Sequence, residues 1–202
     1  MFTGTNSNDA SHSHIYALGP DGSNLHQVSP GGMDQYVRCS ADGKWMVYFD
    51  FSDESIHKMP REGGPSETLV AGSLRPNNQF DLTPDGKQLV VGLHVPTGQK
   101  LALVSIETGK TDKDLPLDAG ANYLAMLPDG KSVSYVAVEN GAQNIFVQPL
   151  NGSGPKQLSR FTQGTGPSKG IRSFARSPDG KQLAVVRVSR RSDVVLLKEP
   201  AN

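Results

Sequence analysis

The sequence predicts an all-β protein, a β-propeller made of four-stranded antiparallel blades. Glycine (22) and proline (14) are frequent among the 202 residues and are spread along the chain, which indicates many turns. A turn motif, PDGK or a close variant, occurs four times, at intervals of 43, 44 and 50 residues. Apolar residues alternate with polar ones after each copy, as in a half-buried strand. A repeat of this length with four short strands matches one propeller blade.

Each copy of the motif predicts a tight turn between two strands. Proline presets φ at the first corner, aspartate can hydrogen-bond the backbone two residues further on, and glycine tolerates a positive φ. The aspartate and glycine residues of the motif are therefore predicted to form structural turns. They are Asp42 and Gly43, Asp85 and Gly86, Asp129 and Gly130, and Asp179 and Gly180.

The strands of each blade follow in order around this turn. A short first strand precedes it, with Val37, Phe80, Leu124 and Phe174 in one column of the repeat. The second strand follows the turn and carries the period-two apolar residues. Third strands are predicted at 55–60, 100–106, 144–150 and 193–198, and fourth strands at 67–70, 113–117 and 156–159.

On this template the chain is a single propeller domain, residues 1–202, with three complete blades between two incomplete ones. Residues 14–18 and 25–29 match a third and a fourth strand, and the last unit lacks a fourth strand. The partial blades do not complement each other, since each has its own third strand. We therefore expect a natural C-terminus and a truncated N-terminus, with a longer parent chain supplying the missing blades, or self-association through open edges. The predicted blades are 1–29 (partial), 35–70, 78–117, 122–159 and 172–199 (partial).

Charge and composition exclude several classes of function. Twenty basic residues balance twenty acidic ones and no basic stripe is present, so neither nucleic acid nor an anionic membrane surface is an expected partner. The longest apolar runs have the length of strands, so membrane insertion is not predicted. Cys39 is the only cysteine, which excludes an intrachain disulfide. No signal peptide is visible at the start of the sequence.

The repeated pattern (S/T)PDGKxLxxV, followed by a third strand of the IY or IF type, resembles the TolB-like propeller repeat. The ending, SFARSPDGKQLAVVR, is similar to the last blade of propellers attached to bacterial serine/threonine kinases or winged-helix regulators. Ala41, Leu127 and Arg176 depart from the family pattern. The resemblance implies a scaffold that binds a protein or a small ligand, names no particular partner, and favours a periplasmic or other extracytoplasmic location.

No catalytic motif is found in the sequence. The nucleophile motif GxSxG of serine hydrolases is absent, and NGSGP (151–155) falls in a predicted hairpin turn. GTGPSKG (164–170) has the wrong spacing for a phosphate-binding P-loop. The HRD and DFG motifs of kinases are also absent. We therefore predict no catalytic residue and no cofactor, and an enzyme that uses channel residues is the least favoured class.

Two clusters contain residues that can bind metal ions, and we interpret both as solvated. His12 and His14 form an HxH pair, but a zinc site usually needs four ligands, or three and a water molecule. Asp50, Asp53 and Glu54 could bind Ca²⁺, but their loop lacks the glycine-punctuated spacing of an EF-hand. No metal site is therefore predicted.

Polar residues on the predicted first strands face the central channel of the propeller. They are Arg38, Asp81 and Arg176. Such groups could recognise a ligand in the channel, and the interpretation we favour is that they are solvated or paired.

Propellers generally bind their partners through loops at one rim, held by the rigid sheets. Here these loops connect fourth strands to first strands and second strands to third strands. They are Gly31–Tyr36, Asp50–Ser55, Gly72–Gln79, Val95–Gln99, Asp118–Tyr123 and Phe161–Arg172. Tyr36, Arg75 and Tyr123 are the side chains predicted to anchor a partner. The predicted function is a non-catalytic binding module for a protein or small ligand. The alternative is a regulatory or sensor domain of a bacterial serine/threonine kinase or transcriptional regulator.

Overall fold

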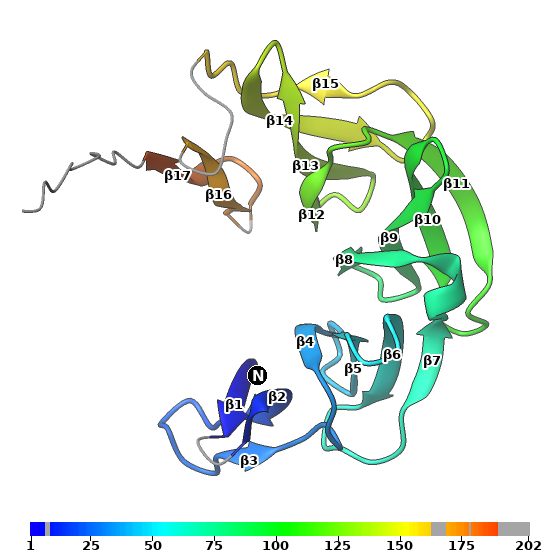
Figure 1. The fold of residues 1–202 in the computed structure, drawn as a ribbon, viewed down its shortest axis with the longest axis vertical. Coiled ribbons are helices and arrows are strands. Elements are labelled where there is room, and N and C mark those ends of the chain that lie inside the picture. Colours follow the sequence, from blue (N-terminus) through cyan, green and yellow to red (C-terminus); the bar gives the residue numbers. More distant parts are fainter. Residues whose placement is uncertain (7–8, 163–168, 178, 190–202) are drawn as a thin grey trace, which may run out of the picture.

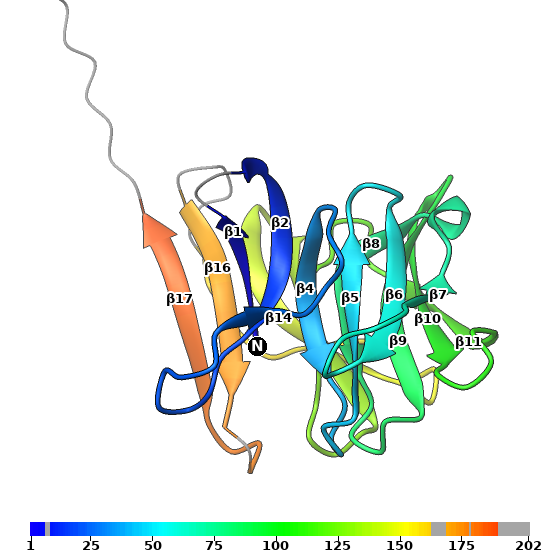
Figure 2. The same ribbon diagram turned by 90° about the horizontal axis from the view of Figure 1, so that it is seen from below.

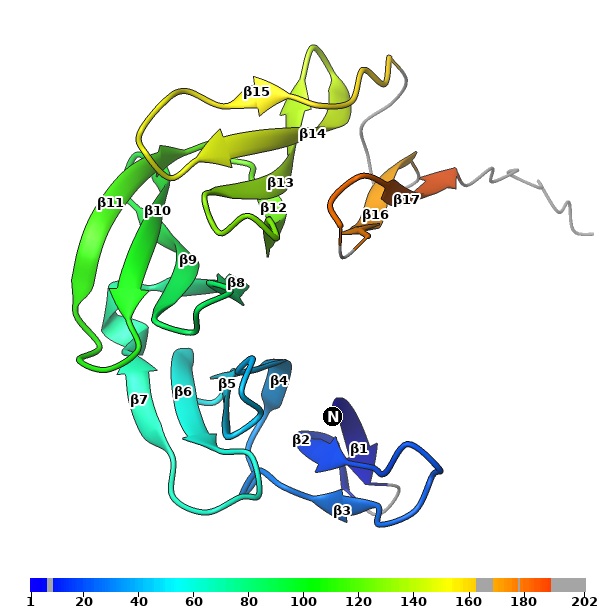
Figure 3. The same ribbon diagram turned by 180° about the vertical axis from the view of Figure 1, so that it is seen from behind.

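The computed structural model describes residues 1–6, 9–162, 169–177 and 179–189. In this part of the chain the strands form five antiparallel sheets, which follow one another around a common centre (Figure 1). We name these sheets blades I to V in chain order. Figure 3 shows blades I and V on the two sides of the opening in the arc.

The strands of each blade are as follows. Blade I contains β1 (Phe2–Asn6), β2 (Asp9–Ala17) and β3 (His26–Gln27). Blade II contains β4 (Asp34–Cys39), β5 (Trp45–Asp50), β6 (Ser55–Pro60) and β7 (Glu67–Val70). Blade III contains β8 (Pro76–Leu82), β9 (Gln88–Val95), β10 (Gly98–Ser105) and β11 (Thr111–Leu117). Blade IV contains β12 (Asn122–Met126), β13 (Ser132–Glu139), β14 (Ala142–Pro149) and β15 (Lys156–Gln157). Blade V contains β16 (Lys169–Arg176) and β17 (Leu183–Ser189).

The fold class predicted from the repeat is confirmed, since in the described residues three four-stranded sheets lie between a three-stranded sheet and a two-stranded sheet. The three strands of blade I occupy the places of a second, a third and a fourth strand. The third strand predicted at 193–198 lies outside the described residues. The helical structure in the described residues is the 3₁₀ turn η1 (Gly72–Leu74). No helix in this part of the chain is long and apolar enough to cross a membrane.

The first strands of blades II to V begin before the ends of the loops predicted at 31–36, 72–79, 118–123 and 161–172, and this corrects the predicted loop boundaries. In β4 and β12 the register against the second strand shifts around Tyr36 and Tyr123, which places one extra residue in each first strand. Such a β-bulge lets the strand resume its pairing beyond the extra residue. Tyr36 and Tyr123 therefore lie within strands rather than in loops. Similar shifts occur in β8 and β16, which begin at Pro76 and Lys169, inside the loops predicted at 72–79 and 161–172.

The apolar core lies between neighbouring blades. Val47 and Phe49 of β5 pack against blade III, whereas Met46 and Tyr48 of the same strand pack against blade I. Successive side chains of a strand point to opposite faces of its sheet, so one run of apolar residues serves two interfaces. Equivalent clusters join blade III to blade IV and blade IV to blade V. Burial on both faces explains why the second strands are apolar almost throughout.

The hairpins place the two groups of connections at opposite edges of the sheets, as Figure 2 shows. We call the edge with the turns between first and second strands the turn rim. The opposite edge, which we call the loop rim, carries the connections from second to third strands and from fourth to first strands. In the described residues the turn rim includes 40–44, 83–87, 127–131, 177 and 179–181. The loop rim includes 30–33, 51–54, 71–75, 96–97, 118–121 and 140–141.

Candidate binding rim

At the turn rim, the aspartates of the repeated motif are held within their own turns. Thr83 Oγ1 donates a hydrogen bond to Asp85 Oδ1 at 2.7 Å, and the backbone N–H of Lys87 donates to the same oxygen at 3.0 Å. Asp42 and Asp179 accept the same two kinds of hydrogen bond. The hydroxyl bond, followed by the backbone bond, lowers the pKa of Asp42, Asp85 and Asp179 below the ordinary value.

The third copy of the turn differs because Leu127 has no hydroxyl. Asp129 keeps the backbone hydrogen bond from the N–H of Lys131, at 2.9 Å. The glycine after the aspartate has a φ between 66° and 70° in all four copies, a conformation that favours glycine. Each carboxylate is therefore part of the local turn of its own blade, and the four do not form a common site.

At the loop rim, Tyr36 and Phe51 form an exposed aromatic pair. Their ring centroids are 6.1 Å apart. The Phe51 ring also packs against Phe49 in a T-shaped arrangement, with ring centroids 4.8 Å apart. Tyr36 is 40% exposed and Phe51 is 37% exposed. Tyr36 lies in the bulge of β4 with a φ of 57°, in the left-handed region that residues other than glycine rarely adopt.

Tyr123 repeats this geometry in blade IV. It lies in the bulge of β12 with a φ of 57° and is 40% exposed. In blade III the corresponding position is Gln79, whose Oε1 accepts a hydrogen bond from the N–H of Leu124 at 3.2 Å. The tyrosine of blade IV is thus two blades away from Tyr36, and a polar residue of blade III stands between them.

Arg75 ends η1 at the loop rim with a φ of 54°. Its carbonyl accepts a hydrogen bond from the N–H of His94 at 3.0 Å, which fixes the loop to β9. Arg75, Phe51 and His94 line a cavity of about 330 Å³ between blades II and III. The structure therefore links two of the three predicted anchors, because Phe51 contacts Tyr36 and shares this cavity with Arg75. Tyr123 does not line this cavity.

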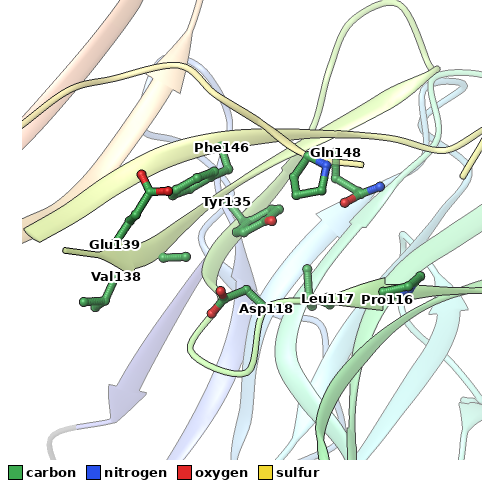
Figure 4. Close-up of a pocket in the computed structure, with 10 residues that line it drawn as sticks. Pro116, Leu117, Asp118, Tyr135, Val138, Glu139, Phe146 and Gln148 are labelled. Carbon is green, nitrogen blue, oxygen red and sulfur yellow. The ribbon is translucent and has the colours of Figure 1, made fainter. Parts of the chain in front are cut away.

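A second cavity, of about 430 Å³, lies between blades III and IV (Figure 4). Tyr135 and Phe146 stack at 5.8 Å along one side of it, and the carboxylates of Asp118 and Glu139 lie at its edges. Burial, and then the charge of Asp118, raises the pKa of Tyr135 to about 12. In the described part of the chain neither Asp118 nor Glu139 takes part in a salt bridge with a basic side chain. The cavity thus combines an aromatic wall with uncompensated negative charge.

The channel residues Arg38 and Asp81 are paired with each other. Arg38 Nε lies 3.4 Å from Asp81 Oδ1, and the guanidinium lies 5.9 Å from the centre of the Phe80 ring. Asp81 Oδ2 accepts a hydrogen bond from the N–H of Met126 at 2.9 Å. This network connects the first strands of blades II, III and IV. Arg176 is not part of it, and its Nη1 donates to the Gly180 carbonyl of its own turn at 3.4 Å.

All but one of the residues considered as metal ligands lie at the junction of blades I and II. His12 and His14 stack along β2, with centroids 6.3 Å apart. Asp50 and Asp53 lie close to His57 of β6, whose Nε2 is 2.9 Å from Asp53 Oδ2. Glu54 lines the cavity next to Arg75 instead of joining this group.

Sequence reasoning missed three residues at the loop rim. Phe51 and His57 were detectable in principle, because FDFSDESIH places an aromatic residue in the second-to-third-strand loop and an imidazole four residues after Asp53. Asp34 carried no signal, since GGMDQY reads as an exposed polar loop, whereas the residue is only 1% exposed.

Comparison with known proteins identifies the fold. No family model and no curated protein sequence matches the chain. Among solved structures, TolB from Acinetobacter baumannii is 19% identical with a TM-score of 0.69, over 90% of this chain and 44% of that one. A TolB-type protein from Agrobacterium tumefaciens gives the same identity and TM-score over 90% of this chain and 65% of that one. The chain thus spans less than two thirds of the length of both.

An enzyme is also similar in structure. An oligogalacturonate lyase, solved in complex with manganese, is 12% identical with a TM-score of 0.63, over 85% of this chain and 50% of that one. The fold is therefore shared by proteins of different activities and does not itself assign one. The resemblance read from the repeated motif is confirmed at the level of the fold, and the chain is a partial β-propeller of the TolB-like fold.

Proposed function

We propose that this chain is a non-catalytic binding module that recognises a protein partner through the loop rim. The anchors are the Tyr36–Phe51 pair together with Arg75, and Tyr123 forms a further contact on blade IV. The observation that carries the proposal is that Tyr36 and Tyr123 are both exposed and both hold a left-handed backbone conformation at the same position of the repeat.

The left-handed conformation at these two positions belongs to the β-bulge of each first strand, but the bulge itself does not require an aromatic side chain there. A left-handed conformation costs a non-glycine residue about 1–3 kcal/mol, and such strain tends to cluster at functional sites. Glycine would remove this cost, and neither tyrosine ring is part of the buried core. Exposed aromatic side chains beside an arginine are the residue types that dominate binding energy at protein interfaces.

The cavity between blades III and IV indicates which part of a partner the rim receives. Asp118 and Glu139 provide negative charge, and Tyr135 and Phe146 provide an aromatic wall. A lysine or arginine side chain of the partner is complementary to both features. This cavity supports a protein partner with an exposed basic residue over an anionic small ligand.

Affinity capture from extracts of the source cell, with matched variants, tests the proposal. The double variant Tyr36→Ala/Tyr123→Ala is expected to lose the proteins that the unmodified chain retains specifically. The control, Lys44→Ala/Lys87→Ala, removes exposed side chains from the turn rim and is expected to retain them. Equal recovery by the two double variants would refute the assigned rim.

The alternative function, a regulatory or sensor domain of a kinase or transcriptional regulator, is favoured by the similarity of SFARSPDGKQLAVVR to the last blade of such proteins. The gene sequence on either side of this segment tests it, because a kinase or winged-helix region in the same reading frame is the expected result. An extracytoplasmic location is part of the same proposal and is tested by cell fractionation. A screen with hydrolase and lyase substrates tests the enzyme alternative, with no turnover expected.

A further inference from the structure

Asp50, Asp53 and His57 form a compact group at the junction of blades I and II. Each offers one ligand atom, and these atoms all lie within 4.8 Å of one another. Asp50 is the last residue of β5, Asp53 lies in the turn that follows, and His57 lies in β6. A short hairpin therefore brings together two carboxylates and one imidazole.

The hairpin holds these side chains in place. Asp50 Oδ1 accepts a hydrogen bond from the N–H of Ser52 at 2.7 Å, and Asp53 Oδ1 accepts one from the N–H of Ser55 at 2.9 Å. The His57 ring stacks on Tyr48, with centroids 5.6 Å apart. Ligands that are fixed in advance lose little conformational freedom when an ion binds.

A second, independent feature of the same junction is the buried carboxylate of Asp34. Asp34 is 1% exposed, and within the described residues neither of its oxygens has a hydrogen-bond partner. Asp34 of β4 lies directly opposite Asp50 of β5 in the register of the two strands, so the two side chains lie on the same face of blade II. Burial raises the pKa of the Asp34 carboxyl group above its ordinary value, the nearby Ser29 side chain lowers it in part, and the charge of Asp50 raises it.

Buried carboxylates are normally paired or coordinate a metal, whereas no described residue lies in hydrogen-bond geometry with either oxygen of Asp34. The nearby Nδ1 of His14 is also buried without a hydrogen-bond partner in the described structure. None of the salt bridges between described residues gives a lysine or arginine to Asp34, Asp50 or Asp53. Apart from the His57 imidazole beside Asp53, no basic side chain among the described residues pairs with these three carboxylates.

We propose that Asp50, Asp53 and His57 bind one divalent transition-metal ion of the zinc type. The buried carboxylate of Asp34, on the same face of the sheet as Asp50, would add negative charge that favours the bound cation. Carboxylate oxygen and imidazole nitrogen are both common zinc ligands, and three protein ligands leave one position for water. Calcium and magnesium prefer a shell made of oxygen alone, so the imidazole favours zinc over these ions. Because Phe51 lies between two of the ligands, the ion would also fix the loop that carries the exposed aromatic pair.

This site goes beyond the proposed binding function and does not depend on it. Zinc binding is measured on the chain alone, whereas partner capture is measured with the aromatic anchors, which are not ligands. A chain that fails to bind zinc can therefore still be tested for partner capture, and a chain that captures no partner can still be tested for zinc binding.

Isothermal titration calorimetry of the chelator-treated 202-residue chain with ZnCl₂ tests the proposal. One zinc ion per chain is expected to bind, and His57→Gln and Asp50→Asn are each expected to weaken the affinity at least about 10-fold. Glu62→Gln, which removes an acidic residue at the other end of blade II, is the matched control and is expected to leave the affinity unchanged. His12→Gln is the control for zinc bound at the surface by the HxH pair.

Thermal unfolding of Asp34→Asn provides the second measurement. Without metal this variant is expected to melt at a higher temperature than the unmodified chain, because it removes a carboxyl group whose charged form is disfavoured by burial. Zinc is expected to raise the melting temperature of Asp34→Asn by less than it raises that of the unmodified chain. For both proteins, CaCl₂ at the same concentration is expected to raise the melting temperature by less than ZnCl₂ does. The proposal is overturned if the unmodified chain shows no saturable zinc binding. It is also overturned if only His12→Gln weakens zinc binding, or if His57→Gln binds zinc as tightly as the unmodified chain.

Discussion

Tyr36 and Tyr123 lie two blades apart and share one backbone conformation, with a φ of 57° at each. Both stand in a β-bulge of a first strand, and both are 40% exposed. Blades II and IV therefore share a left-handed position in the first strand, and a tyrosine occupies it in both. Blade III breaks this pattern with Gln79, whose side chain bonds the next blade instead.

The strain at Tyr123 can be measured by comparing Tyr123→Ala with Tyr123→Gly. Both variants remove the same ring, but only glycine adopts a positive φ without steric cost. Relief of about 1–2 kcal/mol exceeds the roughly 0.5–1 kcal/mol of extra chain entropy that glycine loses on folding. We expect Tyr123→Gly to be more stable than Tyr123→Ala by about 0.5–1 kcal/mol in urea unfolding. An alanine variant of equal or greater stability would show that the position is not strained.

The network around Asp81 predicts unequal effects of its two partners. Asp81→Ala deprives both Arg38 and the N–H of Met126 of an acceptor, so we expect a loss of about 1–3 kcal/mol in unfolding free energy. Arg38→Met keeps the aliphatic stem over Phe80 and removes only a partly exposed ion pair, so we expect a loss below about 1 kcal/mol. Asp81→Asn keeps an acceptor oxygen and should lie between them. If Arg38→Met costs as much as Asp81→Ala, the ion pair and not the link to blade IV carries the stability.

The hydroxyl of the repeated turn predicts a further loss of stability. Thr83 is 8% exposed, and its Oγ1 bonds Asp85 at 2.7 Å and the carbonyl and N–H of Gln88 at 3.1 and 3.0 Å. Thr83→Val keeps the shape of the side chain and removes all three bonds, so we expect a loss of about 1–2 kcal/mol. Thr97→Val, in an exposed loop, is the matched control, with an expected change within about 0.5 kcal/mol. Equal unfolding midpoints for the two variants would contradict the role of the hydroxyl.

The same turn predicts how stability changes with pH. The pKa of Asp85 is below its ordinary value of 3.8, first because of the Thr83 hydroxyl bond. A carboxyl group whose pKa is lower in the folded state stabilises the protein above the unfolded-state pKa, and this contribution is lost as pH falls through the folded pKa. We therefore expect the unfolding midpoint to fall as the pH is lowered below about 4, and to fall less in Thr83→Val because its Asp85 pKa lies closer to the unfolded value. The same decrease in both proteins would rule out the hydrogen bond from Thr83 to Asp85 as a source of the pH dependence.

The repeated sequence was sufficient to predict the blades, because each turn motif is local and its aspartate, glycine and hydroxyl act within a few residues. The alternation around Met46 and Tyr48 likewise predicted strands without reference to their neighbours. The ends of the first strands could not be predicted, because a bulge depends on the register against the second strand. Tyr36 and Tyr123 were for this reason placed at the boundary between a loop and a first strand, whereas they lie within β4 and β12.

The candidate sites were less predictable than the fold, because they form between blades. Tyr36 and Arg75 were chosen from loop position alone, and their connection through Phe51 arises only when blades II and III pack together. The burial of Asp34 depends on blade I covering β4, which no pattern within GGMDQY reveals. Local patterns therefore predicted the scaffold, whereas the chemistry of the rim required the packing of neighbouring sheets.

The most direct test of the proposed binding rim is site-specific photo-cross-linking in the source cell. A photoreactive phenylalanine analogue placed at position 36 or 123 is expected to capture the same partner protein, since both lie at the loop rim. The same analogue at position 87, on the turn rim, is expected to capture none of it. Capture from position 87 with none from positions 36 and 123 would contradict the account.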